Sequence, residues 1–301
     1  MKQLKHTPQQ LFALIVSATM LTACTPTNLK QVHNDKQETE EVLQSTGLQV
    51  ASVEDAVLKA EKAAQNGKMD LAQLYFIKAY ELEPANSQVL QKMTDLYTEL
   101  KKYELAEVSL KLLLKQKPED LSLAEQYGLL LIKLGNYPAA EQQLGRVVAK
   151  QQSWVAYNGL GIIANAQDQA LKAEGLFKKA DSLYPNSPEL LNNIGFSLYS
   201  ADKLEEAEVY YRKALQLNPE FKKAIYNYAL LQARYRRYDQ AYNAFAKVST
   251  PSVANNNTGY IAMMNGDYPV ANTYLQEAVK SSPLFYKKAN DNLMRLELLE
   301  K

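Results

Sequence analysis

Small and large apolar residues recur along this chain at a spacing of 30 to 34 residues. One slot of the repeat is always alanine, at Ala72, Ala106, Ala140, Ala173, Ala207, Ala241 and Ala271. A second slot, twelve residues earlier, is small in every copy: Ala60, Thr94, Gly128, Gly161, Gly195, Ala229 and Gly259. A third slot, four residues after each alanine, is large: Phe76, Leu110, Leu144, Phe177, Tyr211, Phe245 and Leu275. Self-similarity at a fixed period of this length is typical of a repeat architecture built from one supersecondary unit.

The spacing of these slots predicts that each unit is a hairpin of two helices. Between the two small slots a turn glycine lies in three copies, at Gly67, Gly135 and Gly266. Small residues let two helix backbones approach where they cross, and a larger side chain would overpack the crossing by about 1 to 3 kcal/mol. We therefore expect the small slots to meet at the helix crossing, and the large residue to fill the space between neighbouring hairpins.

The copies predict seven units over residues 52–283, followed by a capping helix over 284–301. The predicted units are 53–86, 87–120, 121–153, 154–187, 188–221, 222–251 and 252–283, and most end near a proline (Pro84, Pro118, Pro185, Pro219 and Pro283). The third unit departs from this pattern, because Gln152 stands where a proline is expected. The sixth unit is shortened around residues 247–253, where we expect a local change of curvature. The tail carries apolar residues at helical spacing, as a solenoid needs over its last apolar face: Tyr286, Ala289, Leu293 and Leu296.

The 34-residue period and the order small, small, large, proline resemble the tetratricopeptide repeat. The resemblance implies an all-α, right-handed α-solenoid of about seven helix hairpins with a C-terminal capping helix. Its concave surface is expected to be lined by the first helix of each hairpin. The folded part should begin at Ser52, because Ser52 and Asp55 have the spacing of a capping box. Residues 24–51 are polar and predict a tether, with a helical turn around residues 43–50 as the alternative.

Residues 1–23 have the features of a secretory signal peptide. Lys2 and Lys5 precede an apolar run that is shorter than the roughly 20 residues needed to span a membrane. The letters LTAC, ending at Cys24, resemble the bacterial lipobox. That resemblance implies cleavage before Cys24 and covalent attachment of diacylglycerol and an N-acyl lipid to this residue. The alternatives are an ordinary signal peptide with an incidental cysteine, and a buried free thiol.

The residue after the cysteine bears on the location. In lipoproteins of this type an aspartate in that position commonly signals retention in the inner membrane, and here it is Thr25. The resemblance therefore implies a lipid anchor in the outer membrane of a Gram-negative bacterium, on the periplasmic face.

Composition favours a folded protein without catalytic chemistry. Apolar residues make up 47% of the chain and charged residues 22%, with a net charge of +1, so nothing recruits nucleic acid electrostatically. The chain has one cysteine and two histidines, His6 and His33, too few for a catalytic triad or a zinc site. No glycine-rich phosphate loop is present. We therefore predict no enzyme, no metal and no cofactor other than the lipid; the strict alanine and proline spacing also disfavours a polysaccharide-acting α/α-toroid.

A candidate binding surface lies in the later repeats. Asparagines stand just before the small slot of several predicted first helices, at Asn158, Asn192, Asn193, Asn227, Asn256 and Asn257. An amide both donates and accepts, so such a row can hold the backbone of an extended peptide. Aromatic residues are expected beside it: Phe196, Tyr199, Tyr226 and Tyr260. The alternative is that the asparagines only tie the helices together.

The late repeats, with NNIG at 192–195 and YKKANDNLMRL at 286–296, resemble those of the TadD family of tight-adherence (Flp) pilus assembly lipoproteins. The resemblance implies a scaffold for assembly or secretion of Flp pili, with the secretin or other pilus-assembly subunits as partners. A pilotin for a type IV pilus secretin and an adaptor for peptidoglycan hydrolases share the anchor and the repeats, and stay as alternatives.

Overall fold

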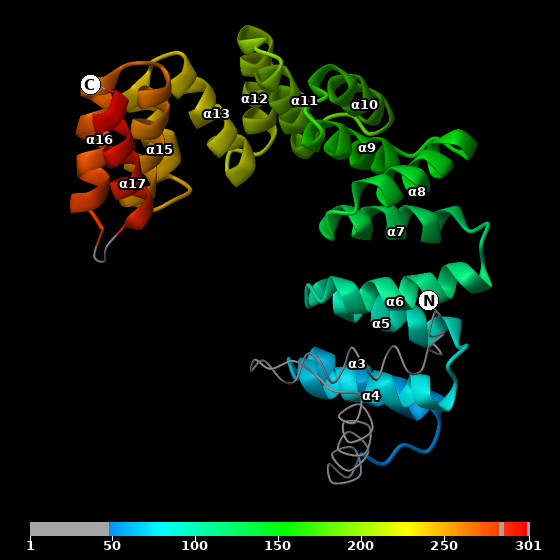
Figure 1. The fold of residues 1–301 in the computed structure, drawn as a ribbon. Coiled ribbons are helices and arrows are strands. Elements are labelled where there is room, and N and C mark those ends of the chain that lie inside the picture. Colours follow the sequence, from blue (N-terminus) through cyan, green and yellow to red (C-terminus); the bar gives the residue numbers. More distant parts are fainter. Residues whose placement is uncertain (1–47, 283–285, 300–301) are drawn as a thin grey trace, which may run out of the picture. The chain divides into compact units, whose positions relative to one another are not determined.

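The computed structural model describes residues 48–282 and 286–299, and every regular element in them is an α-helix (Figure 1). The helices are α3 (Val53–Gln65), α4 (Met69–Leu82), α5 (Ser87–Glu99), α6 (Tyr103–Gln116), α7 (Leu121–Lys133), α8 (Tyr137–Lys150), α9 (Trp154–Ala166), α10 (Ala170–Leu183), α11 (Pro188–Ser200), α12 (Leu204–Leu217), α13 (Lys222–Arg234), α14 (Tyr238–Ala246), α15 (Pro251–Met264), α16 (Tyr268–Lys280) and α17 (Lys287–Leu299). The expectation of an all-α fold is confirmed. The predicted signal peptide, Cys24 and most of the predicted tether lie outside the described residues. None of the helices over residues 48–282 and 286–299 combines the length and the hydropathy that a membrane-spanning helix needs.

The described residues form two compact units, one up to Arg146 and one from Val147. In the first unit α3 packs against α4 and α5 against α6, and a continuous apolar core includes Phe76, Tyr97 and Leu110. In the second unit α9 to α16 form four hairpins, and α17 packs against α15 and α16. The predicted closing residues Ala289 and Leu296 of α17 are buried.

The three slots of the repeat meet inside each hairpin. All seven alanines are fully buried. A Cβ atom added to Gly161 would lie 2.6 Å from the ring of Phe177, and one added to Gly195 would lie 2.8 Å from the ring of Tyr211. The large residue thus packs directly on the small slot of its own hairpin. Phe177 also belongs to a cluster that includes Ile194 of the next hairpin, so the large slot joins successive repeats as expected.

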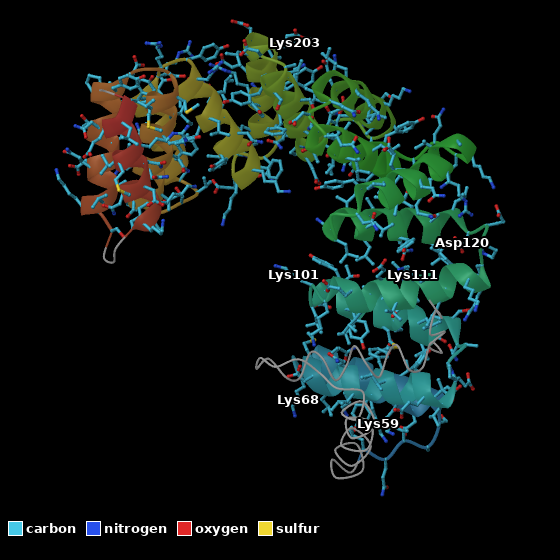
Figure 2. The ribbon with its side chains drawn as sticks, in the orientation of Figure 1. Lys59, Lys68, Lys101, Lys111, Asp120 and Lys203 are labelled. Carbon is cyan, nitrogen blue, oxygen red and sulfur yellow. The ribbon has the colours of Figure 1, made fainter. Side chains whose placement is uncertain are left out.

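Local signals set the ends of the helices. Ser52 accepts a hydrogen bond from the backbone N–H of Asp55, as the capping box predicts, while the Asp55 carboxylate accepts from the backbone N–H of Ala51, one residue before the N-cap. Asp120, labelled in Figure 2, caps α7 by accepting hydrogen bonds from the backbone N–H groups of Ser122 at 3.0 Å and Leu123 at 3.1 Å. Six of the seven hairpins thus begin at a Ser, Asn, Asp or Thr cap, and α13 begins after Phe221 without a side-chain cap.

The sixth hairpin differs from the others in length. Its second helix, α14, has nine residues, whereas the other helices have 13 or 14. The chain then reaches Thr250, which caps α15 by accepting from the backbone N–H of Val253. The shortening expected around residues 247–253 is therefore taken from the C-terminal end of α14. Val248 lies two residues after the end of that helix, where it contributes to the groove described next.

Candidate peptide-binding groove

The predicted asparagines lie on α9, α11, α13 and α15 of the second unit, and their amides form hydrogen bonds between successive first helices. Asn193 donates through Nδ2 to Oδ1 of Asn158 at 2.9 Å. Asn227 donates in the same way to Asn192, also at 2.9 Å, and both pairs are 35 residues apart. Asn192 in turn donates to Oδ1 of Asn193 at 3.3 Å, which joins the two pairs into one chain. We call this chain of four amides the amide ladder.

The same register continues in α15 and α17. Asn257 donates to the hydroxyl of Tyr226 at 3.4 Å, and Asn292 donates to Asn256 at 2.9 Å. Tyr226 thus occupies the position at which α9, α11 and α15 carry an asparagine. Sequence reasoning did not single out Asn292, although it lies 36 residues after Asn256, close to the spacing of the other pairs. These asparagines therefore do form hydrogen bonds between helices, which is the alternative role considered for them.

The ladder leaves some of its amide capacity open, because each amide has two N–H groups and one oxygen with two lone pairs. Asn158, Asn192 and Asn256 are buried, whereas Asn193, Asn227 and Asn257 are half-buried. A peptide-binding role for the asparagines stays a prediction. Replacing them would also remove hydrogen bonds between helices, so loss of binding in such variants would not separate the two roles.

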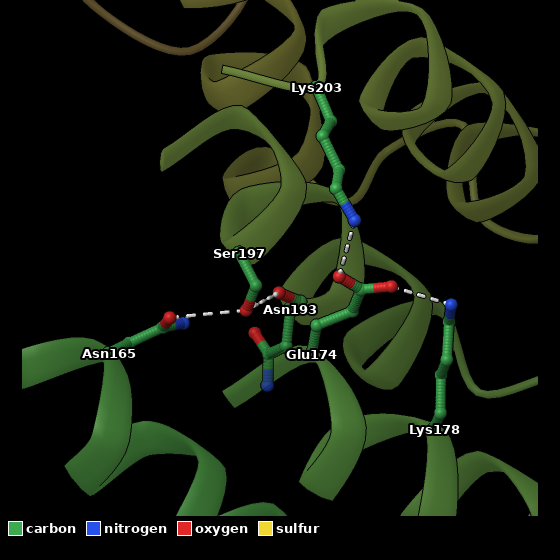
Figure 3. A network of polar contacts seen from close by, with 6 residues as sticks. All are labelled: Asn165, Glu174, Lys178, Asn193, Ser197 and Lys203. Carbon is green, nitrogen blue, oxygen red and sulfur yellow. Dashed lines mark hydrogen bonds and ion pairs between the residues drawn. The ribbon is translucent and has the colours of Figure 1, made fainter. Parts of the chain in front are cut away.

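Two further groups of polar contacts are drawn in Figure 3: one links α9 to α11, and the other links α10 to the residue that precedes α12. Ser197 donates to Oδ1 of Asn165 and is 3.1 Å from the backbone oxygen of Asn193, so it links α9 and α11. Glu174 pairs with Lys178 at 2.6 Å and with Lys203 at 3.3 Å. Burial acts to raise the pKa of Glu174, but the hydrogen bonds from the two lysines outweigh it and the pKa is lowered. This carboxylate is therefore ionised and neutralised by lysines, as in a structural ion pair.

An open groove of about 440 Å³ lies between α11 and α13. It is lined by Asn192, Asn193 and Phe196 from α11, Lys222, Lys223, Tyr226 and Asn227 from α13, and Val248. Phe196 and Tyr226 are each 37% exposed, and the ring of Tyr226 meets that of Phe245 edge-on with centroids 5.1 Å apart. The groove thus combines amides, a fixed aromatic ring, apolar surface and two ammonium groups.

The groove contains five of the ten residues predicted for it: Asn192, Asn193, Phe196, Tyr226 and Asn227. The other five predicted residues are not part of its lining. Tyr260 is exposed on α15, and Tyr199 is half-buried, with its pKa raised by burial. Sequence reasoning missed Lys222, Lys223 and Val248. The lysine pair at the start of a predicted helix was visible in the sequence, but only the fold brings it beside Phe196.

The described residues offer little support for a metal site or a catalytic site. They contain no cluster of three or more histidine, cysteine or acidic side chains that could hold a metal ion. Glu205 and Glu206, near the start of α12, are exposed. The groove itself offers no acidic or nucleophilic pair among its lining residues.

Comparison with known proteins gives the class of the chain. Two family models, each described as a tetratricopeptide repeat, match residues 127–188 and 188–221. The chain is 30% identical over 175 residues to a repeat-containing protein of Pseudomonas aeruginosa, and 25% identical over 197 residues to the BBSome complex member BBS4 homolog of Drosophila melanogaster. It spans 27% of the length of the first relative and 40% of the second. Residues 127–221 of this chain therefore match the tetratricopeptide repeat, and neither family model describes a catalytic domain.

Solved structures agree on the fold. A tetratricopeptide-repeat protein from Parabacteroides merdae matches with a TM-score of 0.64 at 15% identity, over 82% of this chain and all of that one. PilF of Pseudomonas aeruginosa matches with a TM-score of 0.54 at 18% identity, over 69% of this chain and 97% of that one. PilW, described as a widely conserved type IV pilus biogenesis factor, matches with a TM-score of 0.52 at 16% identity, over 80% and 98%. At these identities the likeness establishes the helical-repeat fold, and function has to be argued from this chain's own residues.

Proposed function

We propose that this protein is a lipid-anchored scaffold that supports assembly of Flp pili at the outer membrane by holding an extended segment of a pilus-assembly subunit. The groove between α11 and α13 carries the proposal. It presents the two exposed aromatic residues Phe196 and Tyr226 next to amides with open hydrogen-bonding capacity. Aromatic anchors in a pocket supply much of the binding energy of protein interfaces, and amides satisfy the backbone of a bound segment.

The proposed outer-membrane location and the proposed link to Flp pili are inferred from the sequence. Lipidation at Cys24 is expected from the LTAC stretch, and the late repeats resemble the TadD family. Two or more acyl chains hold a protein stably at a membrane. A scaffold anchored in this way would keep its groove within reach of subunits that assemble at the same membrane.

The second candidate is a role in type IV pilus biogenesis. PilW, which is described by that process, shares the helical-repeat fold with this chain. A pilotin for a type IV secretin needs the same lipid anchor and the same kind of groove. An adaptor for peptidoglycan hydrolases is a third reading that no particular residue favours.

The function is tested by removing the chain from its cells. We expect Flp pili and assembled secretin multimers to be lost, and the full-length chain to restore both. Phe196→Ser should restore them poorly, because losing an aromatic anchor that a bound segment would cover weakens a complex by about tenfold or more. The matched control is Val209→Ser, which changes an apolar residue that is 50% exposed on α12, outside the groove. Normal Flp pili without the chain would contradict the proposal, and selective loss of type IV pili would favour the second candidate.

A further inference from the structure

The charge of the groove is one-sided. Two of its eight lining residues are lysines, Lys222 and Lys223, and none is acidic. Both lysines are exposed and stand in the first turn of α13. Within the described residues neither ammonium group has a hydrogen bond or an ion pair with another side chain. The groove therefore carries two positive charges that the protein does not neutralise.

Several lysines outside the groove lie beside a carboxylate. Lys92 pairs with Glu61 at 2.7 Å, and both Lys178 and Lys203 pair with Glu174. The lysine pair of the groove therefore contrasts with several other lysines of this protein, which lie beside a carboxylate.

Apolar surface adjoins the two charges. Phe196, Tyr226 and Val248 share the groove with the lysines, and Phe196 and Tyr226 remain partly exposed. Opposite charges across an interface steer association and select partners, while apolar anchors supply affinity. A segment that matches both the lysine pair and the apolar surface carries carboxylate side chains close to aromatic or aliphatic ones.

We propose that the groove between α11 and α13 is selective for an acidic segment of a partner protein, in which glutamate or aspartate side chains alternate with apolar ones. The carboxylates contact Lys222 and Lys223, and the apolar side chains lie against Phe196, Tyr226 and Val248. Asn193 and Asn227 contact the backbone of the segment with the amide capacity that the ladder leaves open. This inference rests on the proposed function and adds the chemical class of the partner.

The test uses a fluorescent peptide of alternating glutamate, leucine and phenylalanine, and the same peptide with glutamine in place of every glutamate. Binding to the full chain is measured by fluorescence anisotropy. We expect the acidic peptide to bind about tenfold more tightly than the glutamine peptide, because each exposed ion pair contributes at most modestly and two act together. Its affinity should fall as salt is raised, since exposed charges are screened.

The variant is Lys222→Gln with Lys223→Gln. The affinity for the acidic peptide should fall about tenfold, and the affinity for the glutamine peptide should not change. The control is Lys287→Gln with Lys288→Gln, a lysine pair in the first turn of α17 outside the groove, in which Lys287 is ion-paired with Asp291 at 2.6 Å. Positive charges at the N-terminal end of a helix are unfavourable to its macrodipole, so removing them should not destabilise α13 or α17. Both variants should therefore fold, and circular dichroism checks this.

Three results would overturn the inference: equal binding of the two peptides, undiminished binding of the acidic peptide to the groove variant, or no binding of the acidic peptide to the parent chain. None of them removes the proposed function by itself. A pilus defect in Phe196→Ser cells together with any of these results would mean that the groove holds a segment of different composition.

Discussion

Replacing Ala207 by tryptophan is expected to lower the free energy of unfolding of the second unit by about 3 kcal/mol or more. Ala207 is fully buried on α12, and it shares a core cluster with Phe177, Tyr211 and Ile194. An indole ring has no space there without pushing α12 away from α11. Thermal unfolding followed by circular dichroism measures the effect, which should appear as a large fall in melting temperature.

The matched control is Glu205→Trp, two residues earlier on the same helix. Glu205 is exposed, so a tryptophan there should leave the melting temperature nearly unchanged. Lys203 is less suitable, because the structure places it half-buried with an ion pair to Glu174. Similar falls in melting temperature for Ala207→Trp and Glu205→Trp would contradict the assignment of Ala207 to the helix crossing.

Changing Cys24 to serine is expected to abolish lipidation completely. The sulfur of Cys24 is the proposed acceptor of the diacylglyceryl group, and a serine hydroxyl is a far weaker nucleophile than a thiolate. The uncleaved precursor should accumulate, and radiolabelled palmitate should no longer enter the protein. Thr25→Ser is the control, since it changes the next residue and keeps the thiol. Unchanged palmitate incorporation in Cys24→Ser would contradict the lipoprotein assignment.

The repeat slots were predictable because their cause is local and steric. A helix crossing tolerates only a small residue, so glycine or alanine recurs at Gly161, Gly195 and Ala207 whatever the rest of the sequence does. The cap at Ser52 was predictable for the same reason, since a hydroxyl at that spacing satisfies an open backbone N–H.

Other features depend on the fold and were not accessible from the sequence. The three turn glycines expected from the sequence, Gly67, Gly135 and Gly266, all have positive φ, but the turns without glycine place Lys101 and Arg236 in the same conformation, which the sequence did not indicate. Tertiary packing outweighs the cost of about 1 to 2 kcal/mol for a side chain in that conformation. The groove likewise depends on the stacking of α13 beside α11, which brings Lys222 and Lys223 next to Phe196. The hydrogen bonds of the amide ladder join residues 35 positions apart, and their partners emerge only when the helices are stacked.

We propose that the partner protein binds in the groove between α11 and α13. Site-specific photo-crosslinking in cells tests it most directly, with a photoreactive phenylalanine analogue at Phe196 and, in a parallel strain, at Val209 on α12. Both residues are apolar and partly exposed, so neither replacement should disturb the core. We expect the probe at Phe196 to crosslink to a pilus-assembly subunit and the probe at Val209 not to. Crosslinks from Val209 alone, or none from Phe196 in cells that assemble pili normally, would contradict this proposal.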